Sequence, residues 1–271
     1  MMQRHVASSR GNTYYWIARN QRFPKKALVF LHGLTANHHL FDRQIEAFLN
    51  EYTLIAWDAP GHGKSRPYDG FSYAHLAEEL KRILDAEAIQ KAVLIGQSMG
   101  GFAAQSFLAR YPGMVEGFVA IGTCPYGTAY YGKADFFWLR QIEWMAHCFS
   151  DRGLRACMAR MCGVTEYARS NMIKMLAGYT KEELCRLMYL GFAGFIPEVH
   201  DLRIPCPVCL IVGERDRTGK VQQYNARWHE KERYPLHIVK NASHNANEDN
   251  PEAVNEIIAQ FLEGEIRLNG I

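Results

Sequence analysis

The sequence has no long hydrophobic run. Nowhere in its 271 residues is there a stretch of about 18 consecutive apolar residues, the length at which a membrane-spanning helix becomes a candidate. The amino-terminal stretch Met1–Val6 also lacks the apolar core of a secretory signal peptide. The sequence therefore predicts a protein without a membrane span, and we expect it in the cytoplasm.

An excess of charge of one sign is missing as well. The 31 Lys and Arg against 28 Asp and Glu give a net charge of +3, and the basic residues form no tract. We therefore expect no nucleic-acid partner. With 48% hydrophobic and 22% charged residues, the composition is typical of a globular protein. The length suits one large α/β domain with an inserted subdomain.

Cysteine occurs seven times, an odd number that favours free thiols in a reducing compartment over a disulfide framework. Cys206 and Cys209 have the C-x-x-C spacing of redox and metal pairs. No second pair of Cys or His is close in sequence, and Cys209 lies in an apolar run. We interpret both as core thiols, and the sequence predicts neither a metal site nor a cofactor.

Short apolar runs alternate with helical patterns along most of the chain. The first two runs form a predicted hairpin, and the later ones are continuously apolar, as in strands that are covered on both faces. This alternation predicts a doubly wound, mostly parallel sheet of the α/β class. The predicted strands are residues 3–8, 13–19, 27–31, 53–57, 93–97, 117–121, 208–212 and 236–239.

The alternation stops between residues 126 and 201, where the pattern is helical. Thr180 and Glu183 form a capping box there. We therefore divide the chain into an α/β core, residues 1–125 and 202–271, and a helical insertion after the sixth strand, residues 126–201. The last helix is predicted to begin at Asn250 and Pro251 and to end near Gly264.

Ser98 stands at the end of the fifth predicted strand, between Gly96 and Gly100. A strand, a tight turn that carries Ser, and a helix make a nucleophile elbow. Side chains at the two glycine positions would strike the neighbouring strand and helix. A serine hydroxyl is a weak nucleophile that needs a base, itself oriented by a third group. Ser98 is therefore the candidate nucleophile.

Two later loops offer the partners of Ser98. His244 lies between the last strand and the last helix, at the edge where ligands bind in open α/β sheets, and is the candidate base. The orienting carboxylate is expected after the strand 208–212. The turn there contains both Glu214 and Asp216, and we choose Asp216.

Acyl transfer also requires N–H donors for the oxyanion of the tetrahedral intermediate. The elbow itself supplies the N–H of Met99, and the loop after the strand 27–31 supplies a second donor, for which Leu34 is our candidate. We expect His32 to shape this loop as a hydrogen-bonded core histidine. His38, a few residues further on, is expected to line the entrance of the site.

Three motifs in order resemble the α/β-hydrolase superfamily: His32-Gly33, residues 58–65 (Asp-Ala-Pro-Gly-His-Gly-Lys-Ser), and residues 96–100 (Gly-Gln-Ser-Met-Gly). The resemblance runs from about Ala27 to Leu262, and the order Ser, Asp, His agrees with it. It implies that the turn at 58–65, including His62, is structural. Dehalogenases and epoxide hydrolases of this superfamily have Asp as nucleophile, so Ser98 argues against both chemistries.

The helical insertion resembles the cap of the same superfamily and is rich in Met and aromatic residues. Most of them are expected to form its own core, but some must face the substrate. Our candidates are Trp138, Met145 and Met161. Because such side chains make an adaptable apolar wall, we expect a small-molecule substrate with a hydrophobic acyl or aromatic group.

The predicted function is a serine hydrolase that cleaves a carboxylic ester or a related acyl bond through an acyl-enzyme on Ser98. Lactonase, thioesterase, carbon–carbon bond hydrolase and acyltransferase activities would use the same three residues and stay open as alternatives. A non-enzymatic binding protein of the same fold is the alternative of another class. Binding alone, however, does not demand Ser98, Asp216 and His244 together.

Overall fold

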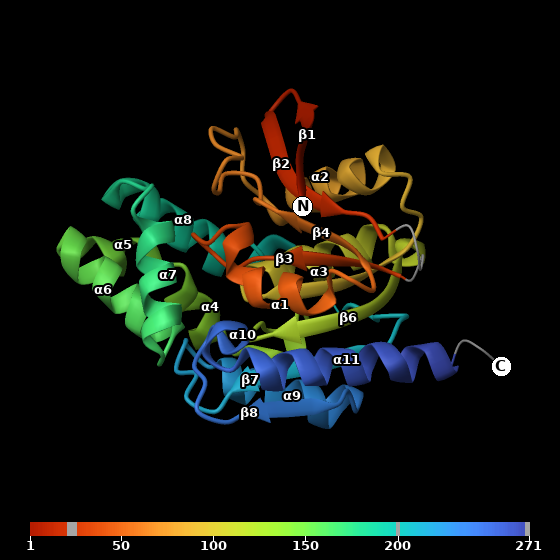
Figure 1. Ribbon diagram of the computed structural model, residues 1–271. Helices are drawn as coiled ribbons and strands as arrows, with labels where there is room; N and C mark the ends of the chain where they lie inside the picture. Colours follow the sequence, from red (N-terminus) through yellow and green to blue (C-terminus); the bar gives the residue numbers. More distant parts are fainter. Residues whose placement is uncertain (21–25, 199–200, 269–271) are drawn as a thin grey trace.

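An eight-stranded sheet forms the centre of the computed structural model, which describes residues 1–20, 26–198 and 201–268 (Figure 1). The strand order is β1-β2-β4-β3-β5-β6-β7-β8. β1 pairs antiparallel with β2, and β2 pairs antiparallel with β4. The six strands β3 to β8 all run parallel to one another. The predicted mostly parallel sheet is thus confirmed. The strands are β1 Met2–Ser8, β2 Gly11–Ala18, β3 Ala27–Leu31, β4 Thr53–Trp57, β5 Ala92–Gln97, β6 Val115–Ile121, β7 Val208–Gly213 and β8 Leu236–Val239.

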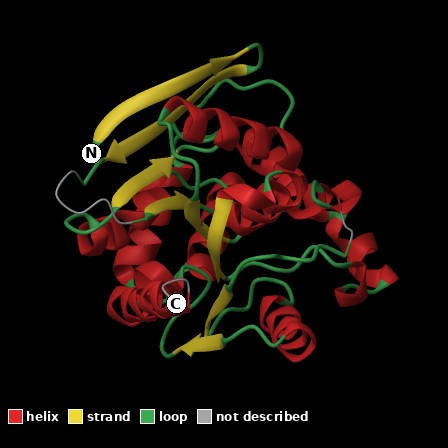
Figure 2. Ribbon diagram, turned by 90° about the vertical axis from the view of Figure 1, so that its right-hand side faces the viewer, coloured by secondary structure: helices red, strands yellow, loops and turns green. Residues whose placement is uncertain are grey.

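Helices cover both faces of the sheet, as Figure 2 shows for the strands between their helical layers. In β3, Leu28 and Phe30 face a cluster shared with α1 and α11, whereas Val29 and Leu31 face a cluster shared with α2, α3 and α9. Successive residues of a strand point to opposite faces, so burial on both sides requires a continuous apolar run. The helices are α1 Asp42–Phe48, α2 Tyr73–Ala86, α3 Met99–Arg110, α9 Val221–Glu232 and α11 Pro251–Leu268.

Five helices follow β6 and gather at one end of the sheet, at the left of Figure 1; we name them the helical insertion. The described residues between β6 and β7 contain no strand, in agreement with the sequence pattern. The capping box of Thr180 and Glu183 is present at the start of α8. The boundary expected at residue 201 adjoins residues 199 and 200, which lie outside the described residues. The helices are α4 Lys133–Leu139, α5 Ile142–His147, α6 Asp151–Cys162, α7 Glu166–Leu176 and α8 Lys181–Ala193.

Two helical segments differ from the expectation. α11 begins as predicted, with the N–H of Ala253 donating to the side chain of Asn250, but it continues past Gly264 to Leu268. A glycine costs a helix only about 1 kcal/mol, which an apolar face buried in the core can offset. The short helix α10 Ala246–Asp249, which follows His244, was not predicted.

No described helix is both long and apolar enough to span a bilayer.

Candidate active site

The loops after β3 and β5 meet where the strand order reverses. From β3 the chain moves outward to β4 and then returns to β5, on the other side of β3. In open α/β sheets, ligands bind outside the carboxyl ends of the strands at such a switch point. Leu34 follows β3 and Ser98 follows β5, so the topology brings these two candidates to the same edge.

Ser98 has a strained backbone, with φ 50° and ψ −115°. A residue other than glycine in such a region costs on the order of 1–3 kcal/mol and persists only where its surroundings hold it. Here the N–H of Ser98 donates to the carbonyl of Ile121 at 2.9 Å, and Thr123 Oγ1 donates to the carbonyl of Ser98 at 2.8 Å. Two contacts from the end of β6 therefore fix the turn.

The two glycines of the elbow allow a close approach of backbone to backbone. A Cβ atom on Gly100 would lie 1.9 Å from the carbonyl oxygen of Leu31 in β3. One on Gly96 would lie 2.7 Å from the backbone of Gly101. Both distances are shorter than any non-bonded carbon contact allows, so the spacing seen in the sequence has a steric cause.

His244 and Asp216 form a buried pair. His244 Nδ1 lies 2.8 Å from Asp216 Oδ2, and the two residues are 6% and 4% exposed. Glu214 is exposed, and its carboxylate accepts the N–H of Asn241 at 3.1 Å. Of the two carboxylates left open by the sequence, Asp216 is the one that contacts His244.

Asp216 is held in its charged form. Burial opposes ionisation, but the charge and hydrogen bond of His244 and the N–H of Thr218 outweigh it, so the pKa of Asp216 lies below its usual value. A charged carboxylate favours a proton on the facing Nδ1 and leaves Nε2 as the acceptor. Among the described residues Ser98 Oγ has no hydrogen-bond partner, and both Ser98 and His244 line one cavity.

His32 shapes the loop that carries Leu34. Its Nε2 accepts the N–H of Ala59 at 2.9 Å, so Nδ1 carries the proton and donates to the carbonyl of Gly33 at 2.7 Å. Burial lowers the pKa of His32 to about 4, which keeps the ring neutral. Within the described part of the chain, neither the N–H of Leu34 nor that of Met99 has an acceptor. Two donors are thus available beside Ser98.

The Ser98 cavity has a volume of about 400 Å³ and lies between the sheet edge and the helical insertion. Of the four residues expected to bind the substrate, Met145 and Met161 are in its wall. His38 and Trp138 are not among its described lining residues. The lining also includes Leu139, Ile142, Phe149, Leu154, Met158, Met172, Met188 and Phe192.

His38 and Trp138 were expected to line the site, but both side chains make their contacts elsewhere in the structure. His38 Nδ1 lies 2.7 Å from Asp58 Oδ1, and its ring stacks on Trp16 with 3.4 Å between centroids. Trp138 is 58% exposed, while Leu139, the next residue of α4, faces the cavity. Because successive helical residues point about 100° apart, α4 can present only one of the two inward.

Comparisons with known proteins identify the family of the chain. The model of the "Alpha/beta hydrolase family" matches residues 28–257, which is most of the chain. The chain belongs to the alpha/beta hydrolase family. It is similar to epoxide hydrolase 4 of Homo sapiens, with 25% identity over 95% of this chain and 77% of the relative. It is also similar to the 2-(acetamidomethylene)succinate hydrolase of Mesorhizobium japonicum, with 24% identity over 87% of each.

Solved structures show the same fold. A thermophilic esterase from Thermogutta terrifontis superimposes with a TM-score of 0.78 at 17% identity, over 98% of this chain and 99% of that one. The enol-lactonase from Burkholderia xenovorans LB400 gives a TM-score of 0.74 at 18% identity, over 96% and 100%. At these identities, the two structures show only that this chain has the same fold as they do.

The turn at residues 58–65 of this alpha/beta hydrolase is held by hydrogen bonds and contacts the loop after β3. Asp58 accepts hydrogen bonds from the N–H groups of His38 and Lys64. His62 is fully buried, and its Nδ1 lies 3.1 Å from the carbonyl of Pro60. Burial lowers the pKa of His62 to about 3. His62 is not in the lining of the Ser98 cavity, in keeping with a structural role.

The two buried neutral histidines predict a loss of stability in mild acid. The pKa values of about 4 for His32 and about 3 for His62 are below the value of an unfolded histidine, so only the unfolded chain takes up these protons as pH falls. Between pH 7.5 and 5.5, each should lower the free energy of unfolding by about 1 kcal/mol.

Urea unfolding of the His62→Asn variant measures this effect. The asparagine amide can replace the donor at Nδ1, and the variant should lose about 1 kcal/mol of the pH dependence between these two pH values. The exposed His147→Asn variant is the control and should keep the dependence of the parent protein. An unchanged dependence in the His62→Asn variant would show that the pKa of this histidine is the same in the folded and the unfolded protein.

Four residues that the sequence did not single out connect Ser98, His244 and the insertion. Gln97 Nε2 donates to the carbonyl of His244 and to Asn245 Oδ1, both at 3.2 Å. Asn245 Nδ2 donates to Glu248 at 2.8 Å, and Asn171 of α7 donates to its other oxygen at 2.5 Å. Burial raises the pKa of Glu248 to about 8. In the sequence, only the positions of Gln97 and Asn245 next to Ser98 and His244 could have indicated that these residues belong to the site.

Asp249 ties the loop of His244 to the insertion. Its carboxylate accepts the N–H groups of Ser243 at 2.8 Å, Val164 at 3.0 Å and Thr165 at 2.8 Å. Val164 and Thr165 lie between α6 and α7, whereas Ser243 precedes His244. We name these contacts the Asp249 anchor. It joins two segments that are far apart in the sequence.

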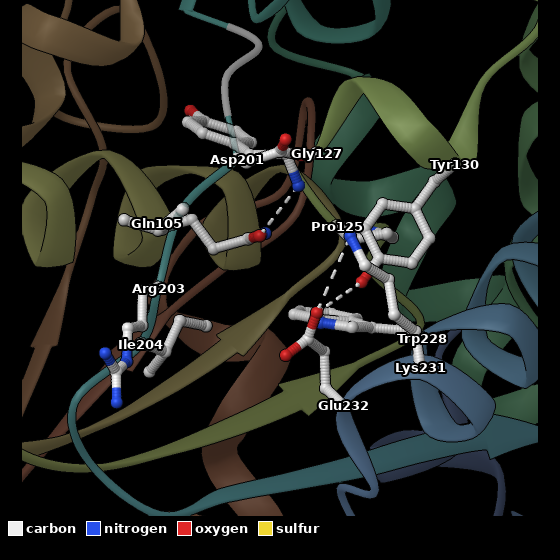
Figure 3. Close-up of a pocket in the computed structure, with 12 residues that line it drawn as sticks. Gln105, Pro125, Gly127, Tyr130, Asp201, Arg203, Ile204, Trp228, Lys231 and Glu232 are labelled. Carbon is white, nitrogen blue, oxygen red and sulfur yellow. Dashed lines mark hydrogen bonds and ion pairs between the residues drawn. The ribbon is translucent and has the colours of Figure 1, made fainter.

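A second hollow of about 130 Å³ lies between α3, α9 and the segment after β6 (Figure 3). Its polar groups bind one another: Tyr130 Oη donates to Glu232 at 3.2 Å, and Gln105 accepts the N–H of Tyr126 at 3.0 Å. Neither Ser98 nor His244 lines it.

Among the described residues of this hydrolase, no group of three or more His, Cys, Asp and Glu is placed to hold a metal ion.

Proposed function

We propose that the protein is a serine hydrolase that cleaves a carboxylic ester or a related acyl bond of a small, partly hydrophobic molecule. The observation that carries this proposal is the buried hydrogen bond between His244 and Asp216, with His244 and the strained Ser98 in the wall of one cavity. An imidazole oriented by a carboxylate beside an elbow serine is the arrangement that activates a hydroxyl.

Each group has a role in the proposed reaction. His244 Nε2 takes the proton of Ser98 as Oγ attacks the carbonyl carbon, and Asp216 holds the imidazole and stabilises its charge. The N–H groups of Leu34 and Met99 bind the oxyanion. His244 then donates its proton to the leaving oxygen, and the acyl–Ser98 bond remains. A water molecule then attacks the acyl carbon as it gives a proton to His244. His244 passes this proton to Ser98 Oγ as the acyl–serine bond breaks, which releases the acid and restores the serine.

The resemblance to epoxide hydrolase 4 raises a rival chemistry. Members of the superfamily that open epoxides have an aspartate as nucleophile at the elbow, and this chain has Ser98 there. We therefore propose acyl transfer to serine in preference to epoxide opening. The seven free cysteines support a reducing compartment, and we propose the cytoplasm as the location.

A fluorophosphonate probe and p-nitrophenyl esters of increasing chain length test the proposal. The protein should be labelled once, on the peptide that contains Ser98, and should release p-nitrophenol with multiple turnovers. Pre-treatment with the probe should remove this turnover. Absence of both labelling and turnover would contradict the proposed function and favour a binding protein of the same fold.

A further inference from the structure

In the part of the chain that the structure describes, the wall of the Ser98 cavity has no Asp, Glu, Lys or Arg side chain. Five methionines from α5, α6, α7 and α8 supply much of its surface. From here on we call the Ser98 cavity the methionine chamber. An ionised group placed in such a wall loses its hydration without gaining a partner, which costs several kcal/mol. The methionines are Met145, Met158, Met161, Met172 and Met188.

The methionine chamber suits a flexible chain. Its volume of about 400 Å³ falls within the range of small-molecule sites, about 300–1,000 Å³. Unbranched methionine side chains adapt to irregular apolar shapes. Met145 and Phe149 line the chamber and are also 42% and 45% exposed, so this part of its wall lies at the surface of the molecule.

A smaller cavity of about 60 Å³ also reaches Ser98 and His244. It lies against Gly122, Thr123 and Tyr131. The single charged side chain among its described lining residues is Lys220, whose Nζ lies 2.6 Å from Asp135 Oδ1. We name this space the side cavity. Two spaces of very different size therefore adjoin the candidate nucleophile.

We propose that the substrate is an ester of an uncharged, flexible fatty acid of medium length with a small alcohol. This rests on the serine hydrolase function proposed above. The acyl chain occupies the methionine chamber, and the alcohol occupies the side cavity. The acyl group stays on Ser98 through both half-reactions, so binding energy from the larger surface acts in both transition states. The alcohol leaves and water enters through the smaller space.

Four esters test the proposal on the unmodified protein. Methyl octanoate should have a kcat/KM at least tenfold above that of methyl acetate, since each buried methylene is worth about fourfold. It should exceed octyl acetate, which reverses the long and short groups, by at least tenfold. It should exceed monomethyl suberate, an acyl chain with the same number of carbons that ends in a carboxylate instead of a methyl group, by at least a hundredfold.

The outcomes separate this inference from the proposed function. Turnover of any of the four esters together with labelling of Ser98 supports the serine hydrolase. With that activity present, a preference for octyl acetate, for methyl acetate or for monomethyl suberate would overturn the inference alone. Absence of turnover and labelling with all four esters would overturn both.

A charge placed in the methionine chamber provides a second test. The Met158→Lys variant should raise the ratio of kcat/KM for monomethyl suberate over methyl octanoate by at least tenfold, because the new ammonium group can pair with the carboxylate. Met158→Gln adds polarity without charge and should raise the ratio less. Ile173→Lys, on the exposed face of α7, is the matched control and should leave the ratio unchanged.

A folded Met158→Lys variant with the ratio of the parent protein would contradict the placement of the acyl chain. Circular dichroism and urea unfolding establish whether the variant is folded. If it does not fold, the four esters with the parent protein still decide the proposal, because their relative rates do not depend on any substitution.

Discussion

Replacement of Ser98 by alanine is expected to lower kcat for ester hydrolysis by about 10⁶, the loss seen when the nucleophile of a serine triad is removed. Labelling by a fluorophosphonate should disappear as well. Without the hydroxyl no acyl-enzyme forms, and His244 has no proton to accept from the elbow. Initial rates with a p-nitrophenyl ester and intact-protein mass spectrometry measure the two effects.

The stability of the Ser98→Ala variant should stay close to that of the parent protein. The side chain of Ser98 makes no hydrogen bond among the described residues, and alanine at φ 50° carries the same backbone strain. Ser170→Ala, at an exposed position of α7, is the control and should keep full activity and labelling. Residual turnover within tenfold of the parent would assign the nucleophile to another residue.

Replacement of Asp216 by asparagine is expected to lower kcat by about 10⁴. The amide fills the same space, but its NH₂ group can face Nδ1 of His244, which favours the tautomer with the proton on Nε2. That tautomer cannot accept the proton of Ser98. The charge that stabilises the imidazolium is lost at the same time. Steady-state kinetics with one ester is sufficient to measure the change.

Glu214→Gln is the matched control for Asp216→Asn. It makes the same chemical change two residues away, at an exposed carboxylate whose contact is the N–H of Asn241. Its kcat should stay within about twofold, because Glu214 does not touch His244. A loss below tenfold in Asp216→Asn, with a large loss in Glu214→Gln, would reverse the assignment of the two carboxylates.

The parts of this protein that depend on local sequence were predicted well. The glycines around Ser98 have a steric cause within a few residues, and the continuous apolar runs follow from burial on both faces of the sheet. The sequence did not show which of Asp216 and Glu214 contacts His244, since both follow β7 in one turn. The turn aims one of them at His244 and the other at Asn241, and this depends on backbone direction.

Contacts between distant segments account for what the sequence did not reveal. His38 was expected at the entrance of the site, but the carboxylate of Asp58, 20 residues later, binds its ring. Trp138 lies next to Leu139, and the rotation of α4 rather than hydrophobicity decides which of them faces the cavity. The hydrogen bond from Gln97 to Asn245 joins residues 148 positions apart, and no local pattern predicts it.

The Asp249 anchor has a bearing on the temperature at which the protein can work. One carboxylate holds Val164 and Thr165 of the insertion together with Ser243, the residue before His244. Heating that frees α6 and α7 would also release the backbone that positions the imidazole, while the parallel strands stay paired. We therefore expect activity to be lost at a temperature below the melting of the sheet, when the contacts between the insertion and the His244 loop, the Asp249 anchor among them, separate.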